Sequence, residues 1–77
     1  MKIVEVQWVD AQSSDEWQTV AHATADELPI ITTVGYLLRH DKTTISVAMQ
    51  LDTKNDKTSM VMTIPSSWIK KLRTLRR

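Results

Sequence analysis

Apolar and polar residues alternate at the start of the chain. In "KIVEVQWVD", Val4, Val6 and Trp8 fall on one face and Glu5 and Gln7 on the other. This period-two pattern is typical of a half-buried β-strand. The first segment is therefore predicted to be a strand whose apolar face joins the core.

The next segment, "AQSSDEWQTVAHATADELP", has a different character. Ser13 is followed three residues later by Glu16, which fits a capping box at the start of a helix. The residues that follow have a loose helical spacing: Trp17, Val20, Ala21, Thr24 and Leu28. Two interpretations stay open: a short helix within residues 13–28, or a long polar loop pinned by Trp17.

From residue 30 the β pattern is continuous. "IITTVGYLLRH", "ISVAMQLD" and "SMVMTI" are rich in β-branched and apolar residues, and the polar turns "DKTT" and "TKNDKT" separate them. The pattern predicts a meander of three strands. Gly35 is the only glycine and falls inside the first of the three. We expect it to mark a bulge or a sharp bend where the sheet curls.

The closing stretch, "TIPSSWIKKLRTLRR", permits two structures. In one, an amphipathic helix places Trp68, Ile69, Leu72 and Leu75 on a common face. In the other, Pro65 ends the preceding strand, the two serines form a single helical turn, and residues 69–75 make a last strand. We favour the strand, because it can pair with the first strand and cover an otherwise exposed sheet edge.

Together these segments predict a mainly all-β protein, with residues 1–77 as one small domain. Their order (strand, long connection that can hold a short helix, three-strand meander, proline turn, last strand) resembles the small five-stranded SH3-like barrel, and "IPSSWI" resembles the segment that closes Src-homology-3 domains. With no phenylalanine present, Trp8 and Trp68 are expected to supply much of the core bulk. The predicted core is Val4, Val6, Trp8, Val34, Ile45, Val47, Met49, Met62, Ile64 and Trp68.

Two short patterns resemble those of Sm-like proteins, a ring-forming branch of the same barrel. The first pattern is matched by Gly35, Leu37, His40 and Asp41, and the second by Ile64, Pro65, Ser66 and Ile69. Ser46 stands near the position of the family's RNA-contacting asparagine. The resemblance implies a Sm-like barrel that forms a ring and binds RNA.

Over its whole length the chain is also similar to small uncharacterised proteins of tailed bacteriophages. The similarity lies in "VEVQWVDA", "TVGYLL", "AMQLD" and "TIPSSWI". It implies a phage accessory protein that acts in the cytoplasm of the host cell.

Composition narrows the function classes. The 77 residues include no cysteine and only two histidines, His22 and His40, so we expect neither a disulfide framework nor a metal site, and no cofactor. No nucleophile–base pair and no phosphate-cradling glycine loop is recognisable, and an enzyme is not expected. The chain has no apolar run of about 20 residues and no signal peptide at its start, which favours a cytoplasmic protein without a membrane span.

Charge is divided along the chain. Residues 1–30 carry one lysine against six acids, whereas residues 31–77 carry nine bases against three acids. The candidate nucleic-acid-binding residues, for RNA or DNA, are Arg39, His40, Lys42, Lys70, Lys71, Arg73, Arg76 and Arg77, with the Tyr36 and His40 rings available for base stacking. A solvated surface or a solubilising tail is the plain alternative for these charges.

Self-association is the further expectation. A short chain without disulfides or metal gains stability from partners, and oppositely charged halves favour head-to-tail contact between copies. We therefore predict a homo-oligomeric ring joined through strand edges. The competing function is a protein–protein interaction module or adaptor that binds a host or phage protein.

Overall fold

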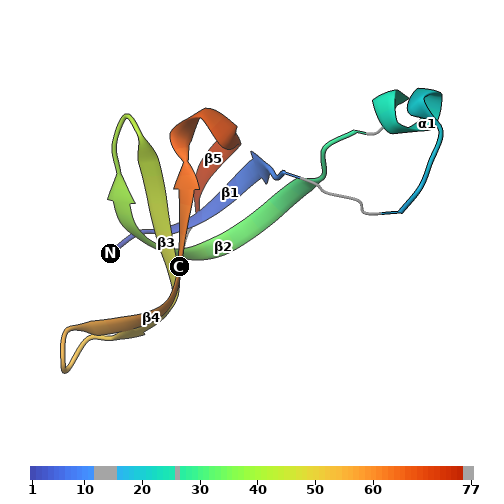
Figure 1. Ribbon diagram of the computed structural model, residues 1–77. Coiled ribbons are helices and arrows are strands. Elements are labelled where there is room, and N and C mark those ends of the chain that lie inside the picture. Colours follow the sequence, from blue (N-terminus) through green and yellow to red (C-terminus); the bar gives the residue numbers. More distant parts are fainter. Residues whose placement is uncertain (12–15, 26, 76–77) are drawn as a thin grey trace.

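Five strands form one antiparallel sheet, which confirms the all-β prediction (Figure 1). The structure is a computed structural model and describes residues 1–11, 16–25 and 27–75. The elements are β1 (Ile3–Val9), α1 (Val20–Ala25), β2 (Ile30–His40), β3 (Thr44–Asp52), β4 (Lys57–Pro65), the 3-10 helix η1 (Ser66–Trp68) and β5 (Ile69–Leu75). The strand order is β4-β3-β2-β1-β5, so β1, β2 and β3 are the inner strands.

The last segment is a strand, as favoured from the sequence, and the amphipathic-helix alternative is wrong. β5 pairs with β1 in antiparallel register, with Val6 opposite Leu72. Pro65 ends β4, and one helical turn, η1, reverses the chain before β5 begins. The amide of Ser66 donates a 2.9 Å hydrogen bond to the Thr43 carbonyl, which gives this turn a fixed place beside the β2–β3 turn.

The core lies where β1, β3 and β4 face one another. Six buried side chains form it: Val4, Val6, Trp8, Ile45, Val47 and Ile64. All six were predicted from alternation. Four partly buried residues from β2 and β5 pack against them: Ile31, Leu37, Ile69 and Leu72.

Four further core predictions are wrong, because Val34, Met49, Met62 and Trp68 are all exposed. The two methionines lie on the β3–β4 hairpin. Pairing of β3 with β2 covers Ile45 to Ala48 only, and beyond Ala48 the hairpin has no third strand on the β3 side. This explains Met49. Met62 instead lies opposite the buried Val47, on the outer strand β4, which has no neighbouring strand on its other side. The period-two pattern therefore predicts the buried face correctly at residues 45 and 47 but not at these two methionines.

Trp68 has an intermediate position. Its ring stacks on that of Trp8, with a centroid separation of 6.4 Å and an interplanar angle of 17°. Trp8 is only 7% exposed, and its indole N–H donates a 3.0 Å hydrogen bond to the Thr33 hydroxyl. Trp68 covers Trp8 from outside and stays 39% exposed. Trp68 therefore covers the core from outside and is not itself buried in it.

Gly35 is needed for a close backbone approach rather than for a bulge. Its φ is not positive, and its pairing with Val4 is in regular register. A Cβ atom at this position would lie 2.6 Å from the Ala48 carbonyl oxygen. The bulge in β2 lies between Leu37 and Arg39 instead. Because residue 35 has no side chain, the backbone of β2 can lie close to that of β3 at the point where β2 changes from pairing with β3 to pairing with β1.

The connection between β1 and β2 contains a helix shorter than the 13–28 range. α1 is capped by Thr19, whose hydroxyl accepts a 3.1 Å hydrogen bond from the His22 amide. The prediction of a short helix within residues 13–28 is confirmed by α1. The predicted cap Ser13 lies outside the described residues. The pinned-loop alternative is wrong, because Trp17 is fully exposed. α1 buries none of its residues.

Two segments extend away from the sheet (Figure 1). One is the connection that carries α1, and the other is the outer half of the β3–β4 hairpin. They give the chain dimensions of 54 × 23 × 21 Å and a radius of gyration of 15.9 Å. A compact domain of this length has a radius of about 11–12 Å. The fold therefore presents far more surface than its small core requires.

Candidate interaction surfaces

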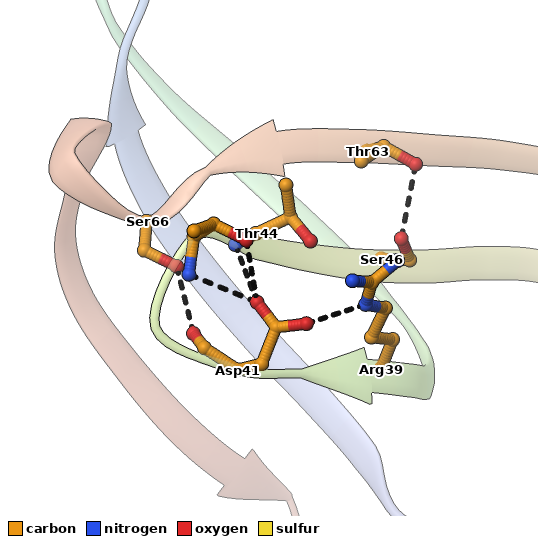
Figure 2. A network of polar contacts seen from close by, with 7 residues as sticks. Arg39, Asp41, Thr44, Ser46, Thr63 and Ser66 are labelled. Atoms are coloured by element: carbon orange, nitrogen blue, oxygen red, sulfur yellow. Dashed lines mark hydrogen bonds and ion pairs between the residues drawn. The ribbon is translucent and has the colours of Figure 1, made fainter.

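Three of the candidate basic residues, Arg39, His40 and Lys42, lie exposed at the turn between β2 and β3. Asp41 organises this turn (Figure 2). Its Oδ1 atom accepts 2.9 Å hydrogen bonds from the amides of Thr43 and Thr44 and from the Thr43 hydroxyl. Its Oδ2 atom pairs with the Arg39 guanidinium. Arg39 is thus partly neutralised within the chain, whereas His40 and Lys42 face solvent.

The same carboxylate is held in its ionised form. The hydrogen bond from the Thr44 amide, then that from the Thr43 amide, and then the Arg39 guanidinium keep the pKa of Asp41 well below its ordinary value. Its backbone joins a distant part of the chain, since the Ser66 hydroxyl donates a 3.0 Å hydrogen bond to the Asp41 carbonyl. This arrangement makes Asp41 a structural residue that fixes the β2–β3 turn beside η1.

The other basic candidates lie on β5. Lys70 is the extra residue of a bulge, because Gln7 pairs with Lys71 while Trp8 pairs with Ile69. Arg73 forms a 3.0 Å ion pair with Glu5 on the neighbouring strand. Within the described part of the chain, Lys42, Lys70 and Lys71 make no ion pair. Arg76 and Arg77, also predicted to bind nucleic acid, lie outside the described residues.

Ser46, the residue near the Sm-like asparagine position, does not reach the surface. It is 9% exposed, and its hydroxyl is 2.9 Å from that of Thr63 across the β3–β4 pair (Figure 2). The hydroxyls satisfy each other inside the sheet. Direct contact of Ser46 with a base would require this bond to break.

A groove at the start of β5 was not foreseen from the sequence. We call it the tryptophan groove; its volume is about 550 Å³. Its lining combines apolar side chains, one carboxylate and one ammonium group: Val9, Asp10, Ala11, Leu28, Ser67, Trp68 and Lys70. These residues come from three distant stretches of sequence. Pairing of β1 with β5 and the hydrogen bond from the Asp10 amide to the Pro29 carbonyl bring them together.

The second unforeseen surface is the outer half of the β3–β4 hairpin, residues 49–60, which we call the methionine hairpin. Met49 and Met60 are 64% and 60% exposed. Met60 has φ 55°, in the left-handed region that a long side chain rarely occupies. Such a conformation costs about 1–3 kcal/mol. Met60 lies between the Ala48–Val61 and Gln50–Ser59 pairs of the ladder, and the register is the same on both sides of it.

Comparisons with protein-family models, with curated proteins and with solved structures find no match. The likeness to Sm-like and to phage proteins accordingly remains a prediction from the sequence. In the part of the chain that the structure describes, no helix is long and apolar enough to cross a membrane. The same residues contain no group of three or more acidic, histidine or cysteine side chains that could hold a metal ion.

Proposed function

We propose that this protein is a non-enzymatic interaction module that works as a homo-oligomer. The observation that carries the proposal is surplus surface with many exposed apolar side chains. The chain exposes 6303 Å², whereas a compact monomer of its 8.8 kDa mass exposes about 4,800 Å². The difference of about 1,500 Å² equals the area that a standard protein–protein interface buries in total.

Large apolar side chains contribute to this surface. Among the described residues, eleven large hydrophobic side chains are exposed, against six buried ones. Single exposed hydrophobic residues are ordinary, but contiguous ones mark contact surfaces. Met60, Val61 and Met62 are consecutive in β4 and all exposed, and because successive side chains of a strand point to opposite faces, both faces of β4 carry exposed apolar groups. They lie on β4, which together with β5 forms the outer edges of the sheet order.

The two outer strands supply a mode of assembly. β4 of one copy can pair with β5 of the next, and a repeated head-to-tail contact closes into a ring when the rotation between copies allows it. Light scattering at tens of micromolar protein tests the proposal. We expect a mass of several chains. A mass of one chain, 8.8 kDa, would overturn it.

Nucleic-acid binding is the second candidate. Its support is the exposed, unpaired state of Lys42, Lys70 and Lys71 within the described residues. Binding to phosphates weakens as salt rises, with a slope of about −0.7 per contact for single strands. Titration with a single-stranded oligonucleotide at two salt concentrations should show this slope. The double variant K70A/K71A should reduce it by about 1.4, and absence of binding at low salt would leave protein interaction alone.

A further inference from the structure

Each copy of the chain exposes one apolar projection and one apolar groove, and the two are complementary. The projection is the methionine hairpin, whose Met49 and Met60 side chains are unburied. The groove is the tryptophan groove, where Trp68 and Leu28 are the large exposed apolar side chains. Thioether groups pack favourably against aromatic rings. The volume of about 550 Å³ is sufficient for two such side chains.

A copy cannot fill its own groove. Met60 precedes Ser66 by six residues of extended strand, a distance of about 20 Å. Figure 1 shows the hairpin turn pointing away from η1, which supplies Ser67 and Trp68 to the groove. The occupant of the groove must therefore come from another molecule.

Charge is consistent with a second copy as that occupant. The groove carries one acid, Asp10, and one base, Lys70. The hairpin carries Asp52 directly opposite Lys57 in its ladder. With Lys54 and Asp56 at its turn, the hairpin carries two acids and two bases. Neither surface therefore has a net charge, and a hairpin can lie in the groove without net electrostatic repulsion.

We infer that the methionine hairpin of one copy inserts into the tryptophan groove of the next. This inference rests on the proposed self-association and adds a side-chain contact to the pairing of β4 with β5 proposed there. Both methionines lie beyond the part of β3 that pairs with β2, and both are exposed, so a neighbour can contact them. The contact is heterologous, so each molecule uses both surfaces and assembly continues until a ring closes.

Two variants separate the surfaces without disturbing the core. M49S/M60N alters the hairpin, and asparagine tolerates the left-handed conformation of residue 60. L28D alters the groove at a side chain that is 56% exposed. V20S is the matched control, because Val20 is an exposed apolar residue of α1, outside both surfaces. Circular dichroism checks that every variant folds.

Sedimentation or light scattering then measures mass against concentration. We expect each surface variant to weaken association at least tenfold and V20S to match the wild type. An equimolar mixture of M49S/M60N and L28D retains one intact contact per pair and should yield heterodimers.

If both variants keep the wild-type mass, the hairpin–groove contact is wrong while self-association stands. A mixture that stays monomeric also overturns the contact. A monomeric wild type overturns this inference together with the proposed function.

Discussion

Replacing Gly35 by alanine tests the crossing of β2 over β3 most directly. The added Cβ would lie 2.6 Å from the Ala48 carbonyl oxygen and 3.2 Å from its carbonyl carbon, where ordinary contact begins near 3.4 Å. Both atoms belong to the backbone of an inner strand, so no flexible side chain can yield. The strands must separate, and the clash falls beside residues of the core.

The size of the effect follows from two opposing terms. Alanine reduces the freedom of the unfolded chain, which stabilises the fold by about 0.4–1 kcal/mol where the native geometry accepts it. Overpacking of a tight contact costs about 1–3 kcal/mol or more. We expect the clash to dominate and the free energy of unfolding to fall by about 1–3 kcal/mol. A domain of this length has only about 4–12 kcal/mol in total.

Thermal and urea unfolding, followed by circular dichroism at one fixed protein concentration, measure this change. The midpoint temperature should fall by about 4–24 °C. Thr32→Ala, at an exposed position of the same strand, is the control and should stay within about 0.5 kcal/mol of the wild type. A G35A midpoint equal to that of the wild type would mean that β2 does not approach Ala48 closely, and the account of the crossing would fail.

Three other predictions concern single side chains. Folding lowers the pKa of Asp41, so the carboxylate stabilises the protein at pH values above 3.8, the ordinary pKa of the group, and this stabilisation is lost as the pH falls toward the lower pKa of the folded state. D41N should therefore reduce the loss of stability at acidic pH. An unchanged dependence of stability on pH would contradict this. Trp68→Ala should lower the free energy of unfolding in urea by about 2–3 kcal/mol, less than the ~3–5 kcal/mol lost with a fully buried ring. The near-ultraviolet circular dichroism signal of the stacked pair should also disappear. A loss below about 0.5 kcal/mol would mean that Trp68 does not cover Trp8. Glu5→Gln breaks an exposed ion pair and should change stability by less than about 1 kcal/mol, a limit that a larger loss would refute.

The alternation of apolar and polar residues was sufficient to predict the strands. It also predicted which face of β1, and of the first half of β3, is buried. Those positions are covered on the predicted side, and the pattern follows from the two-residue period of the backbone. Pro65 likewise identified the end of β4, since its ring fixes φ and removes a donor. These features are local, and local sequence determines them.

Features that depend on where a partner strand ends could not be predicted in the same way. Met49 continues the alternation of Ile45 and Val47 but lies beyond the residues that β2 covers. The tryptophan groove combines residues that are more than fifty positions apart, such as Val9 and Trp68. A signal existed in the predicted pairing of the first and last strands, which places Trp8 beside the residue after Trp68. That pairing predicts which residues lie near one another, but it does not predict that they line a groove.

The path of β2 accounts for both the small core and the exposed apolar surfaces. At Gly35, β2 turns from β3 to β1, and this leaves the outer half of the β3–β4 hairpin without a third strand. The same departure extends β2 toward the connection that places Leu28 at the groove. Burying the hairpin within one chain would require β2 to continue alongside β3 beyond Ala48, whereas a second copy can cover it by contact. The exposed methionines are therefore a consequence of the strand path itself, and a partner that covers them would complete a core that one chain forms only in part.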